Sequence, residues 1–342
     1  MHDVRWFGSN RHTHLVVPDL RGRGLSVATE GDAPARLAFA ASGTVARAAW
    51  QYSRRRRVPL VLYVWDLPPW RLGDGRADPV LDFRGRLVRV PRLAGAYRER
   101  RGYYSMLSHV ARRAAEVWVP SRLTEADVRA RFGVEPRHVP YCFDSRLFTP
   151  PAGAREEGAP LLSVSRLEPH KDHETALRAA AALDWGIRVV GRGPRAAELR
   201  DYAAGVRASA TVETDVDDAG LLAAYRAARV VVAPSRFEGF GMTGIEAVAC
   251  GTPVAASDIP PHREFLEGLA HFFPPGDVRA AAAAIRAAHA APRPDPARVR
   301  GLGIEAAAER FAAGFARLLQ RPFRAAAEAQ GRGPVHREGA SA

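Results

Sequence analysis

Short apolar runs alternate with alanine-rich stretches through the second half of the chain, and this alternation restricts the fold more than any other feature. The apolar runs predict strands, and the stretches between and after them predict helices. Strands that alternate with helices form a parallel sheet covered on both faces. The second half is therefore expected to be an α/β domain, with strands at 161–167, 187–190, 210–214, 230–233 and 253–257 and final helices at 278–291 and 303–320.

The first half shows the same alternation less regularly. The run PLVLYVWD at 59–66 is nearly continuous in apolar residues, which is typical of a strand buried on both faces of a parallel sheet. The remaining segments predict strands at 2–8 and 116–121, helices at 35–52 and 93–115, and a loop at 71–92.

Domain boundaries follow from composition. Residues 151–160 are rich in Pro, Gly and charge without periodicity, which predicts a linker. We expect an N-terminal domain over 1–150 and a C-terminal domain over 161–321. Residues 322–342 lack a periodic pattern and predict a mobile tail.

The net charge of +13 is concentrated in the first half. Residues 1–150 hold 26 arginines and 14 acidic residues, whereas the rest of the chain has an excess of only one positive charge. Such a surface attracts an anionic membrane leaflet or an anionic acceptor. The alternative is that the arginines only solvate the surface. No nucleic-acid recognition motif accompanies them, so nucleic acid is not an expected partner.

The sequence predicts a cytoplasmic protein, with membrane association through the basic half as a further possibility. No apolar run approaches the roughly 18 residues of a spanning helix, and no apolar leader precedes a cleavage site. Cys142 and Cys250 lie in separate apolar runs, which is typical of reduced core residues.

The stretch that follows the apolar run at 230–233 has the features of an anion site. Glu238, Gly239 and Gly241 form a loop, and a helix is expected to begin at Met242 and end at Gly251. The free N–H groups of a helix start attract phosphate. A carboxylate repels phosphate, so Glu238 and Glu246 are better suited to accept hydrogen bonds from sugar hydroxyls. The alternative is a surface loop with two solvated glutamates.

The spacing of Glu238 and Glu246 resembles the E-x7-E signature of retaining GT-B glycosyltransferases, most closely glycosyltransferase family 4 (glycosyl transferases group 1). The flanking phrases APSRFEGFG and EAVACGTPVAASD match as well. The resemblance implies two Rossmann-like domains facing across a cleft, with the final helices of the second domain returning to brace the first. It implies that Glu238 lies at the donor sugar and that Glu246 holds the ribose. It further implies that a diphosphate is held by the loop amides of Phe240, Gly241, Met242 and Thr243.

The phrase LLSVSRLEPHKD resembles the phosphate-binding turn of the same family, with Arg166 and Lys171 as a clamp on the distal phosphate. Lys171 is the only lysine among 50 basic residues. Departure of a nucleotide diphosphate leaves negative charge on the phosphate, and fixed cations stabilise that charge. The resemblance therefore implies that Glu238, Arg166 and Lys171 are catalytic.

The phrase IRVVGRGPRAAEL resembles the family's glycine turn near the nucleotide. It implies donor contacts from Gly191 and Gly193, and from Thr214 and Asp215 near the base. The same glycines fit a dinucleotide-binding fingerprint with Glu213 as the ribose carboxylate. An NAD-type oxidoreductase is a weaker alternative, because the glycines follow the second strand of the domain and because this interpretation gives the two glutamates and the clamp no role.

A metal site is not expected. Asp215 and Asp217 have the spacing of a D-x-D motif, but Asp217 is better explained as a helix N-cap. His170, His173 and His262 have no partners at metal-ligand spacing, and we expect solvated or capping roles for them. Glu264 matches a family position behind the donor site and is expected to support the loop.

The first hundred residues resemble the family only loosely. The opening strand corresponds to the family's second strand, so the domain is expected to lack its first βα unit. Asp66 follows the strand at 59–66 and is a candidate for acceptor contact, although a turn or helix cap would equally explain it. Trp65 stands where relatives have a histidine.

The resemblance as a whole implies a retaining glycosyltransferase that moves a sugar from a nucleotide diphosphate donor to a glycan, lipid-linked or small-molecule acceptor. We expect it to need neither a metal nor a cofactor. The alternative from another class is a non-catalytic anion- or lipid-binding module on a degenerate transferase scaffold.

Overall fold

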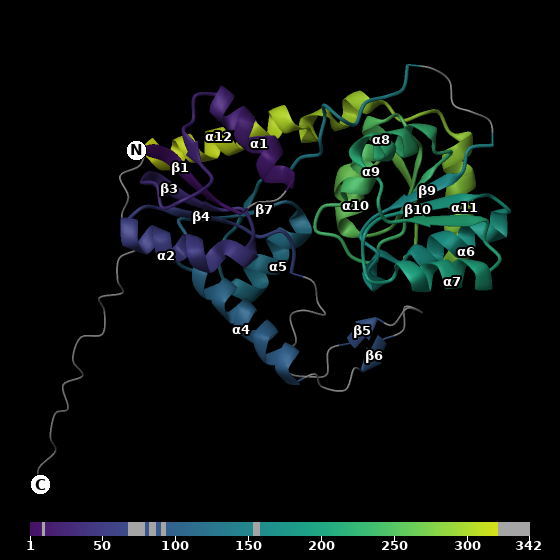
Figure 1. Cartoon of the computed structure of the whole chain (residues 1–342), viewed down its shortest axis with the longest axis horizontal. Coiled ribbons are helices and arrows are strands. Elements are labelled where there is room, and N and C mark those ends of the chain that lie inside the picture. The colour runs from purple at the N-terminus through teal and green to yellow at the C-terminus, as the bar shows by residue number, and fades with distance from the viewer. Residues whose placement is uncertain (9–10, 68–78, 82–86, 90–93, 153–157, 321–342) are drawn as a thin grey trace, which may run out of the picture.

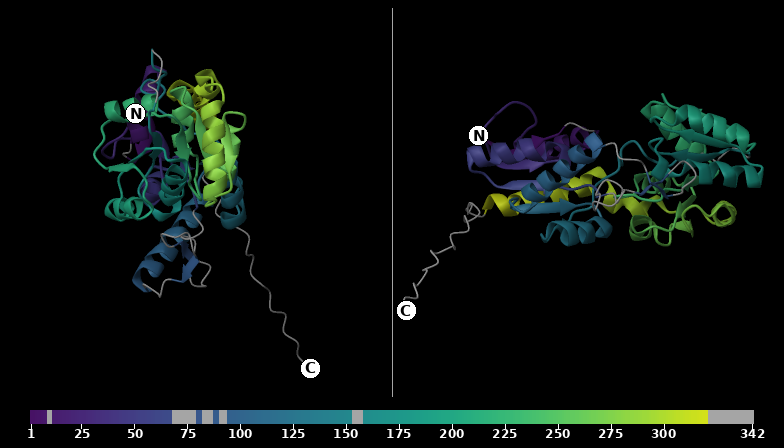
Figure 2. Two further views of the ribbon diagram at one scale, coloured as in Figure 1. Left: turned by 90° about the vertical axis from the view of Figure 1, so that its right-hand side faces the viewer. Right: turned by 90° about the horizontal axis from the view of Figure 1, so that it is seen from below.

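Two parallel six-stranded sheets, one in each half of the chain, form the frame of the structure (Figure 1). The computed structural model describes residues 1–8, 11–67, 79–81, 87–89, 94–152 and 158–320. The two sheets lie in separate domains that are placed end to end along the longest axis of the molecule, as Figure 1 and the right view of Figure 2 show.

The sheet of the first domain has the strand order β2-β1-β3-β4-β7-β8, with every pair parallel. The predicted strands at 2–8, 59–66 and 116–121 are confirmed. Strand β4 is buried along its whole length, as its apolar sequence requires. The six strands are β1 (His2–Phe7), β2 (Val27–Ala28), β3 (Ala35–Ala40), β4 (Leu60–Tyr63), β7 (Glu116–Val119) and β8 (Arg137–His138).

The predicted helix at 35–52 is wrong over its first part. Residues Ala35–Ala40 form strand β3, a 3₁₀ turn follows at Gly43–Val45, and helix α2 covers Ala46–Arg56. Alanine favours helices, but propensity is a weak preference that tertiary contacts override. Strand β3 lies between β1 and β4, and this pairing in the middle of a buried sheet determines its conformation.

Three further helices cover this sheet or extend from it: α1 (Arg11–Gly22), α4 (Ala94–Ala111) and α5 (Arg122–Phe132). Ser121 caps α5 by accepting a hydrogen bond from the N–H of Thr124. Within the predicted loop at 71–92, the described residues form an antiparallel pair, β5 (Pro79–Leu81) and β6 (Leu87–Arg89). The rest of that loop lies outside the described residues, as do residues 153–157 of the predicted linker and the predicted tail.

The sheet of the second domain has the strand order β11-β10-β9-β12-β13-β14, and all five predicted strands are confirmed. The additional strand β14, AHFF before two prolines, is too short to be recognised from its pattern. The chain winds outward in opposite directions from β9 and β12, which makes these neighbours a topological switch point. The strands are β9 (Leu161–Val164), β10 (Ile187–Val190), β11 (Ala210–Glu213), β12 (Val231–Ala233), β13 (Val254–Ser257) and β14 (Ala270–Phe273).

Six helices belong to the second domain, and the predicted helix start at Met242 is confirmed. Gly251 follows that helix with a φ of +64°, the left-handed conformation expected of a helix end. The helices are α6 (His173–Leu183), α7 (Ala196–Gly205), α8 (Asp218–Ala227), α9 (Met242–Ala249), α10 (Pro260–Leu266) and α11 (Val278–Ala290).

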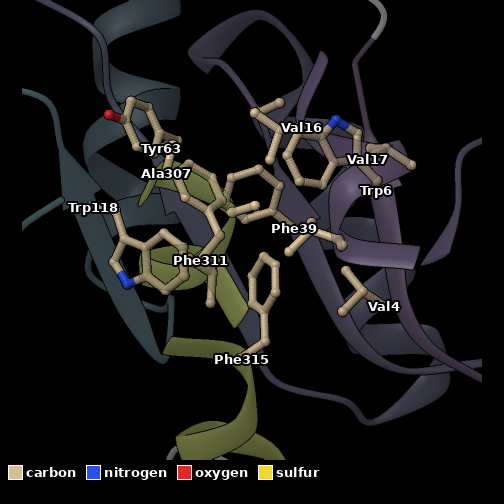
Figure 3. Packing of buried hydrophobic residues seen from close by; sticks show 14 of the residues in the cluster. Val4, Trp6, Val16, Val17, Phe39, Tyr63, Trp118, Ala307, Phe311 and Phe315 are labelled. Atoms are coloured by element: carbon tan, nitrogen blue, oxygen red, sulfur yellow. The ribbon is translucent and has the colours of Figure 1, made fainter. Parts of the chain in front are cut away.

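The last helix, α12 (Ile304–Gln320), leaves the second domain and packs on the first, along α1 (Figure 1). Phe311 and Phe315 enter the aromatic core of the first domain beside Phe39 and Trp118 (Figure 3). The ring centroids of Phe39 and Phe315 are 5.3 Å apart, and those of Trp118 and Phe311 are 5.2 Å apart. The helix therefore completes the core of a domain from which it is distant in sequence.

Candidate functional site

Two loops meet at the carboxyl ends of β9 and β12, at the switch point of the second sheet. The first loop, residues 165–172, follows β9 and contains a 3₁₀ turn at Pro169–Lys171. The second loop, residues 234–241, follows β12 and leads into α9. Ligands of open α/β sheets bind in the crevice outside such strand ends. The sequence-predicted residues Arg166, Lys171 and Glu238 all lie on these two loops.

The closest contact between the loops is an ion pair that joins two of the predicted residues. The Nζ atom of Lys171 lies 2.6 Å from Oε1 of Glu238, and the two side chains are 10% and 16% exposed. The hydroxyl of Ser235 donates to the same oxygen at 2.7 Å. The cation and the acid that the sequence assigned to neighbouring parts of one ligand are thus in direct contact.

The surroundings of Glu238 keep it ionised. Burial raises the pKa of a carboxyl group, but the charges of Lys171 and His262 and the hydrogen bonds from Lys171 and Ser235 together outweigh burial. They lower the pKa of Glu238 to about 2. Glu238 is therefore a fixed anion at neutral pH, suited to accept hydrogen bonds and unsuited to donate a proton.

A second charged contact braces the same two loops. The Nε atom of Arg236 lies 2.9 Å from Oδ2 of Asp172, and the N–H of Arg236 donates to the carbonyl of His170 at 2.8 Å. Asp172 is 5% exposed and has a φ of +51°. Burial raises the pKa of Asp172 to about 6 in spite of the Arg236 charge.

The start of α9 has the form that the sequence predicts. Gly241 is the N-cap with a φ of +86°, and in the part of the chain that the structure describes no side chain caps this helix start. A methyl group at Gly241 would lie 2.8 Å from Cδ2 of His262, so the buried imidazole requires a glycine there. Phe240 is buried against Phe265, with ring centroids 4.4 Å apart.

The first turn of α9 is attached to the end of β9. The hydroxyl of Thr243 donates to the carbonyl of Val164 at 2.8 Å. Glu246 is three residues further along the same helix and lies on the same face as Thr243. It is 8% exposed, and its Oε2 atom accepts a hydrogen bond of 2.7 Å from the hydroxyl of Tyr225. Met242 also contributes to the core behind the helix.

Arg166 does not contact Lys171 or Glu238 in this structure. Its guanidinium pairs with Glu168 at 2.7 Å, and its side chain is 58% exposed. Arg166 lies on the same loop as Lys171, but its side chain would have to turn inward to form the predicted clamp.

The two glycines of the turn after β10 allow a close approach between backbones. A methyl group at Gly191 would lie 1.7 Å from the carbonyl oxygen of Ser165, and one at Gly193 would lie 2.6 Å from that of Leu167. The turn therefore packs directly on the loop that carries Arg166 and Lys171.

The neighbouring segment after β11 carries Thr214 and Asp215. Arg192 donates to the carbonyl of Thr214 at 3.3 Å, and the hydroxyl of Thr214 donates to Asp215 at 3.1 Å. Glu213, the ribose carboxylate of the dinucleotide alternative, is held by Arg188 through bonds of 2.9 and 2.8 Å.

The first domain reaches the second loop at one point. A methyl group at Gly239 would lie 2.5 Å from the carbonyl oxygen of Trp65 and 3.1 Å from Cβ of Asp66. The indole N–H of Trp65 donates to the carbonyl of Ala41 at 2.8 Å. Asp66 is thus brought beside the loop that carries Glu238, across the boundary between the domains.

Glu264 joins the two domains, and its expected role behind the donor loop is wrong. Its carboxylate accepts a hydrogen bond of 2.8 Å from the N–H of Arg122 and lies 3.1 Å from Nε2 of His138. Arg122 begins α5 and His138 ends β8, both in the first domain. Glu264 lies on α10, and only the domain arrangement shows what its carboxylate faces.

Two of the three histidines differ from the prediction because they are buried. His173 is 1% exposed between the hydroxyls of Ser163 and Ser165, and burial lowers its pKa to about 3. His262 is 1% exposed, and burial likewise lowers its pKa. Among the described residues, no three His, Cys, Asp or Glu side chains gather as a metal-binding group. The N-cap role of Asp217 is confirmed by its bond from the N–H of Gly220.

Sequence reasoning missed four side chains that shape the site: Asp172, Arg236, Ser235 and Tyr225. The first three could have been found from the phrases KD and PSRFEG, because each lies within three residues of Lys171 or Glu238. Tyr225 had no such signal, since it lies 21 residues from Glu246 in the sequence.

A separate cavity of about 670 Å³ lies beside the segment that joins the two domains. Its lining includes Phe143, Phe148, Pro150, Arg300 and Glu305, and it includes neither Lys171 nor Glu238. Within the described ranges, no helix combines the length and apolar character needed to cross a membrane.

Comparison with known proteins agrees with this geometry. Residues 146–300 match the family model for glycosyl transferases group 1. A phosphatidyl-myo-inositol mannosyltransferase from Mycobacterium leprae is 37% identical over 143 residues, which are 39% of this chain and 38% of that protein. A D-inositol 3-phosphate glycosyltransferase from Acidothermus cellulolyticus is 34% identical over 174 residues, 43% of this chain and 39% of that protein. The chain thus matches about two fifths of the length of these relatives.

Solved structures extend the likeness to both domains. Sucrose-phosphate synthase from Thermosynechococcus elongatus aligns with a TM-score of 0.64 at 25% identity, covering 83% of this chain and 74% of that one. Anabaena HepE, solved in complex with UDP-glucose, aligns with a TM-score of 0.62 at 16% identity, covering 94% and 98%, and shows the fold alone. Residues 146–300 are therefore similar to the glycosyl transferases group 1 family, in a chain whose two α/β domains have the GT-B fold.

Proposed function

We propose that this protein is a retaining glycosyltransferase that moves a sugar from a nucleotide diphosphate donor to an acceptor hydroxyl. The observation that carries the proposal is the contact between Lys171 and Glu238 beside the open start of α9, with Asp66 of the first domain next to the same loop. A cation for phosphate, free helix N–H groups and a fixed carboxylate for hydroxyls thus lie together at the switch point.

Each group has a distinct role in the proposal. The N–H groups of Gly241 to Thr243 and the positive end of α9 hold the diphosphate. Lys171, and Arg166 after an inward turn of its side chain, stabilise the charge on the leaving group, so the reaction needs no metal. Glu238, with its pKa near 2, accepts hydrogen bonds from the donor sugar, and Glu246 accepts them from the ribose.

Retention is proposed to follow a front-face course. The acceptor hydroxyl attacks on the side from which the diphosphate leaves, and a phosphate oxygen takes its proton. The bond to the diphosphate breaks as the new glycosidic bond forms, so no enzymic nucleophile is required. Trapping of a covalent glycosyl-enzyme would contradict this course.

The names of the relatives indicate which acceptors to test first. Both sequence relatives act, by name, on inositol compounds, one of them a phospholipid. We therefore propose a hydroxyl-rich acceptor, free or lipid-linked, bound on the side of Asp66. UDP- and GDP-sugars are the first donors to test.

An anionic membrane surface is a proposed partner of the first domain. Helix α2 ends in Arg54, Arg55 and Arg56, which are exposed, and Arg54 stacks over the ring of Trp50 at 5.3 Å. An arginine of such a patch attracts acidic headgroups by about 1 kcal/mol, and Arg55 and Arg56 contribute less than Arg54 because Asp32 pairs with both of them. Co-sedimentation with vesicles of phosphatidylserine, compared with vesicles of phosphatidylcholine alone, tests this partner.

The decisive experiment combines donor binding with turnover. Thermal shifts with UDP, GDP, ADP and their sugars identify the nucleotide, because a ligand that binds only the folded state raises the melting temperature. Transfer or hydrolysis of the matching sugar donor is then expected in the wild type and lost in Glu246→Ala. Glu267→Ala is the matched control, since Glu267 is exposed and its carboxylate pairs with Arg263 on the surface of α10. Binding of anions without any turnover would favour the non-catalytic alternative.

A further inference from the structure

The side chain of Tyr225 lies between the ring of Phe148 and the carboxylate of Glu246. It belongs to the last turn of α8 and is fully buried. Its hydroxyl donates to Oε2 of Glu246 at 2.7 Å, and its ring meets that of Phe148 edge-on with centroids 5.3 Å apart. Its carbonyl accepts a hydrogen bond of 2.7 Å from the hydroxyl of Thr252.

This arrangement fixes the tyrosine from several directions. Thr252 is fully buried and binds its main chain, while Phe148 packs on its ring. The adjacent Arg226 donates to the carbonyl and the hydroxyl of Thr149 at 2.8 and 2.6 Å. The end of α8 is therefore attached to the segment that joins the two domains, and the phenol has little freedom to turn.

The phenol of Tyr225 keeps its proton at neutral pH and therefore remains a hydrogen-bond donor. Burial raises the pKa of Tyr225 well above its usual value, and the charge of Glu246 raises it further. A hydrogen bond from a neutral donor to a buried carboxylate is stronger than one between neutral groups. It also defines the plane of the carboxylate, because one of its two oxygens is fixed in direction.

The carboxylate held in this way belongs to the wall of the candidate donor site. Glu246 shares a helix face with Thr243, which is bonded to the carbonyl of Val164 at the end of β9. The loop with Arg166 and Lys171 begins directly after that strand end. A small rotation of the Glu246 side chain would therefore change what it offers to a ligand in the crevice.

We propose that Tyr225 is a positioning residue that orients Glu246 toward the ribose hydroxyls of the nucleotide donor. The inference rests on the proposed function, because it assumes that Glu246 binds ribose. It assigns to the enzyme a residue that does not touch the donor and acts through the carboxylate of Glu246, while its phenol also contacts the side chain of Thr243.

The test compares two ligands that differ only in the hydroxyls concerned. The dissociation constants of UDP and 2′,3′-dideoxy-UDP, or of the GDP pair if GDP binds, are measured by calorimetry for the wild type and for Tyr225→Phe. The wild type is expected to prefer the ribonucleotide. Tyr225→Phe keeps the ring and removes the hydroxyl, so the preference is expected to fall about tenfold, the size of one hydrogen bond to a charged group.

Three further variants separate positioning from packing. Glu246→Gln is expected to lower the preference as well, and adding Tyr225→Phe to it should have no further effect, because both changes act on one contact. Phe148→Leu disturbs the packing of the ring but keeps the phenol, and should leave the preference unchanged. Tyr202→Phe, on α7, is the matched control for loss of a phenol oxygen elsewhere in the domain.

The outcomes distinguish this inference from the proposed function. If the wild type binds none of the nucleotides, both are overturned. If it prefers the ribonucleotide and Glu246→Gln removes the preference while Tyr225→Phe does not, the function stands and the role of Tyr225 is refuted. A preference that survives Glu246→Gln would refute the ribose role of Glu246 and, with it, the inference.

Discussion

At the scale of single residues, the site depends on how one lysine and one glutamate balance each other. Lys171 and Glu238 are both largely buried, and each would be costly to bury alone. Together they hold a carboxylate with a pKa near 2 next to a helix start that favours anions. The lysine can bind a phosphate oxygen while it remains bonded to Glu238, since an ammonium group has three donors.

Replacement of Lys171 by methionine is expected to abolish most of the activity and to lower stability. The variant keeps the length of the side chain but leaves Glu238 buried without its cation, which costs about 3–5 kcal/mol in comparable pairs. Loss of a donor to the leaving group should reduce kcat by about 10²–10³. Denaturant unfolding and steady-state kinetics measure the two effects.

The double variant Lys171→Met/Glu238→Gln is the control for this prediction. Removal of both charges should recover much of the stability, because no unpaired charge then remains buried. It should recover none of the activity, because the donor to the leaving group is still missing. Recovery of activity in the double variant would show that Lys171 acts only by neutralising Glu238.

Asp172 makes stability depend on pH in the opposite sense from Glu238. Its pKa of about 6 lies above the value of about 4 expected in the unfolded chain, so the folded state binds the proton more tightly. The contribution of this group is therefore fully present below pH 4 and is lost as pH rises through 6. The loss amounts to about 2–3 kcal/mol for a shift of this size.

Asp172→Asn tests this pH dependence. Asparagine tolerates the left-handed backbone conformation at this position and cannot ionise. The difference in unfolding free energy between wild type and variant should shift against the wild type by about 2 kcal/mol between pH 4 and 7. A difference that stays constant with pH would show that folding does not raise the pKa of Asp172.

At the scale of elements, the glycine turn after β10 matters because two backbones touch. Gly191 and Ser165 are too close for a side chain at residue 191. At Gly205, the end of α7, a methyl group would have no heavy atom of the described residues within 4 Å beyond its own helix and chain neighbours. The two glycines occur in the same domain, which makes them a matched pair.

Gly191→Ala is expected to destabilise the second domain by about 3 kcal/mol or more, because the carbonyl of Ser165 would have to move. It should also weaken nucleotide binding, since the loop with Arg166 and Lys171 moves with Ser165. Gly205→Ala should be neutral or slightly stabilising, because alanine favours a helix. Thermal unfolding and the nucleotide thermal shift compare them, and equal effects would contradict the backbone contact.

At the scale of the whole molecule, the domains are held together by contacts of α12 and of α10. Helix α12 inserts Phe311 and Phe315 into the first domain (Figure 3). Glu264 of α10 binds the start of α5. A carboxylate at a helix start is favoured by the free N–H groups and the helix dipole. Glu264 therefore holds the domains at the position where Gly239 meets Trp65.

Glu264→Gln is expected to loosen the two domains without unfolding either. The amide keeps one acceptor but loses the charge that favours the helix start and the contact with His138. Hydrogen exchange of the first-turn amides of α5 should rise several-fold, with the radius of gyration from small-angle scattering unchanged or larger. Glu267→Gln, on the same side of the molecule but exposed, is the control, and equal exchange in both variants would contradict the bridging role.

The sequence alone determined five of the six strands of the second domain and the two loops of its site. Its apolar runs are short and bounded, and Gly241 and Gly251 occur where the backbone needs positive φ, so local pattern and tertiary fold agree. In the first domain, Ala35–Ala40 misled the prediction, because alanine carries no information about pairing and the neighbours β1 and β4 decided its conformation.

Only the tertiary structure decided the partners within the site. Lys171 and Glu238 are 67 residues apart, and Glu264 and Arg122 are 142 apart. Contacts over such distances depend on the order of strands in a sheet and on the placement of two domains, which no local pattern encodes. Periodicity and backbone constraints act over a few residues, so they indicate where a loop begins, whereas ion pairs and domain contacts depend on how the whole chain packs.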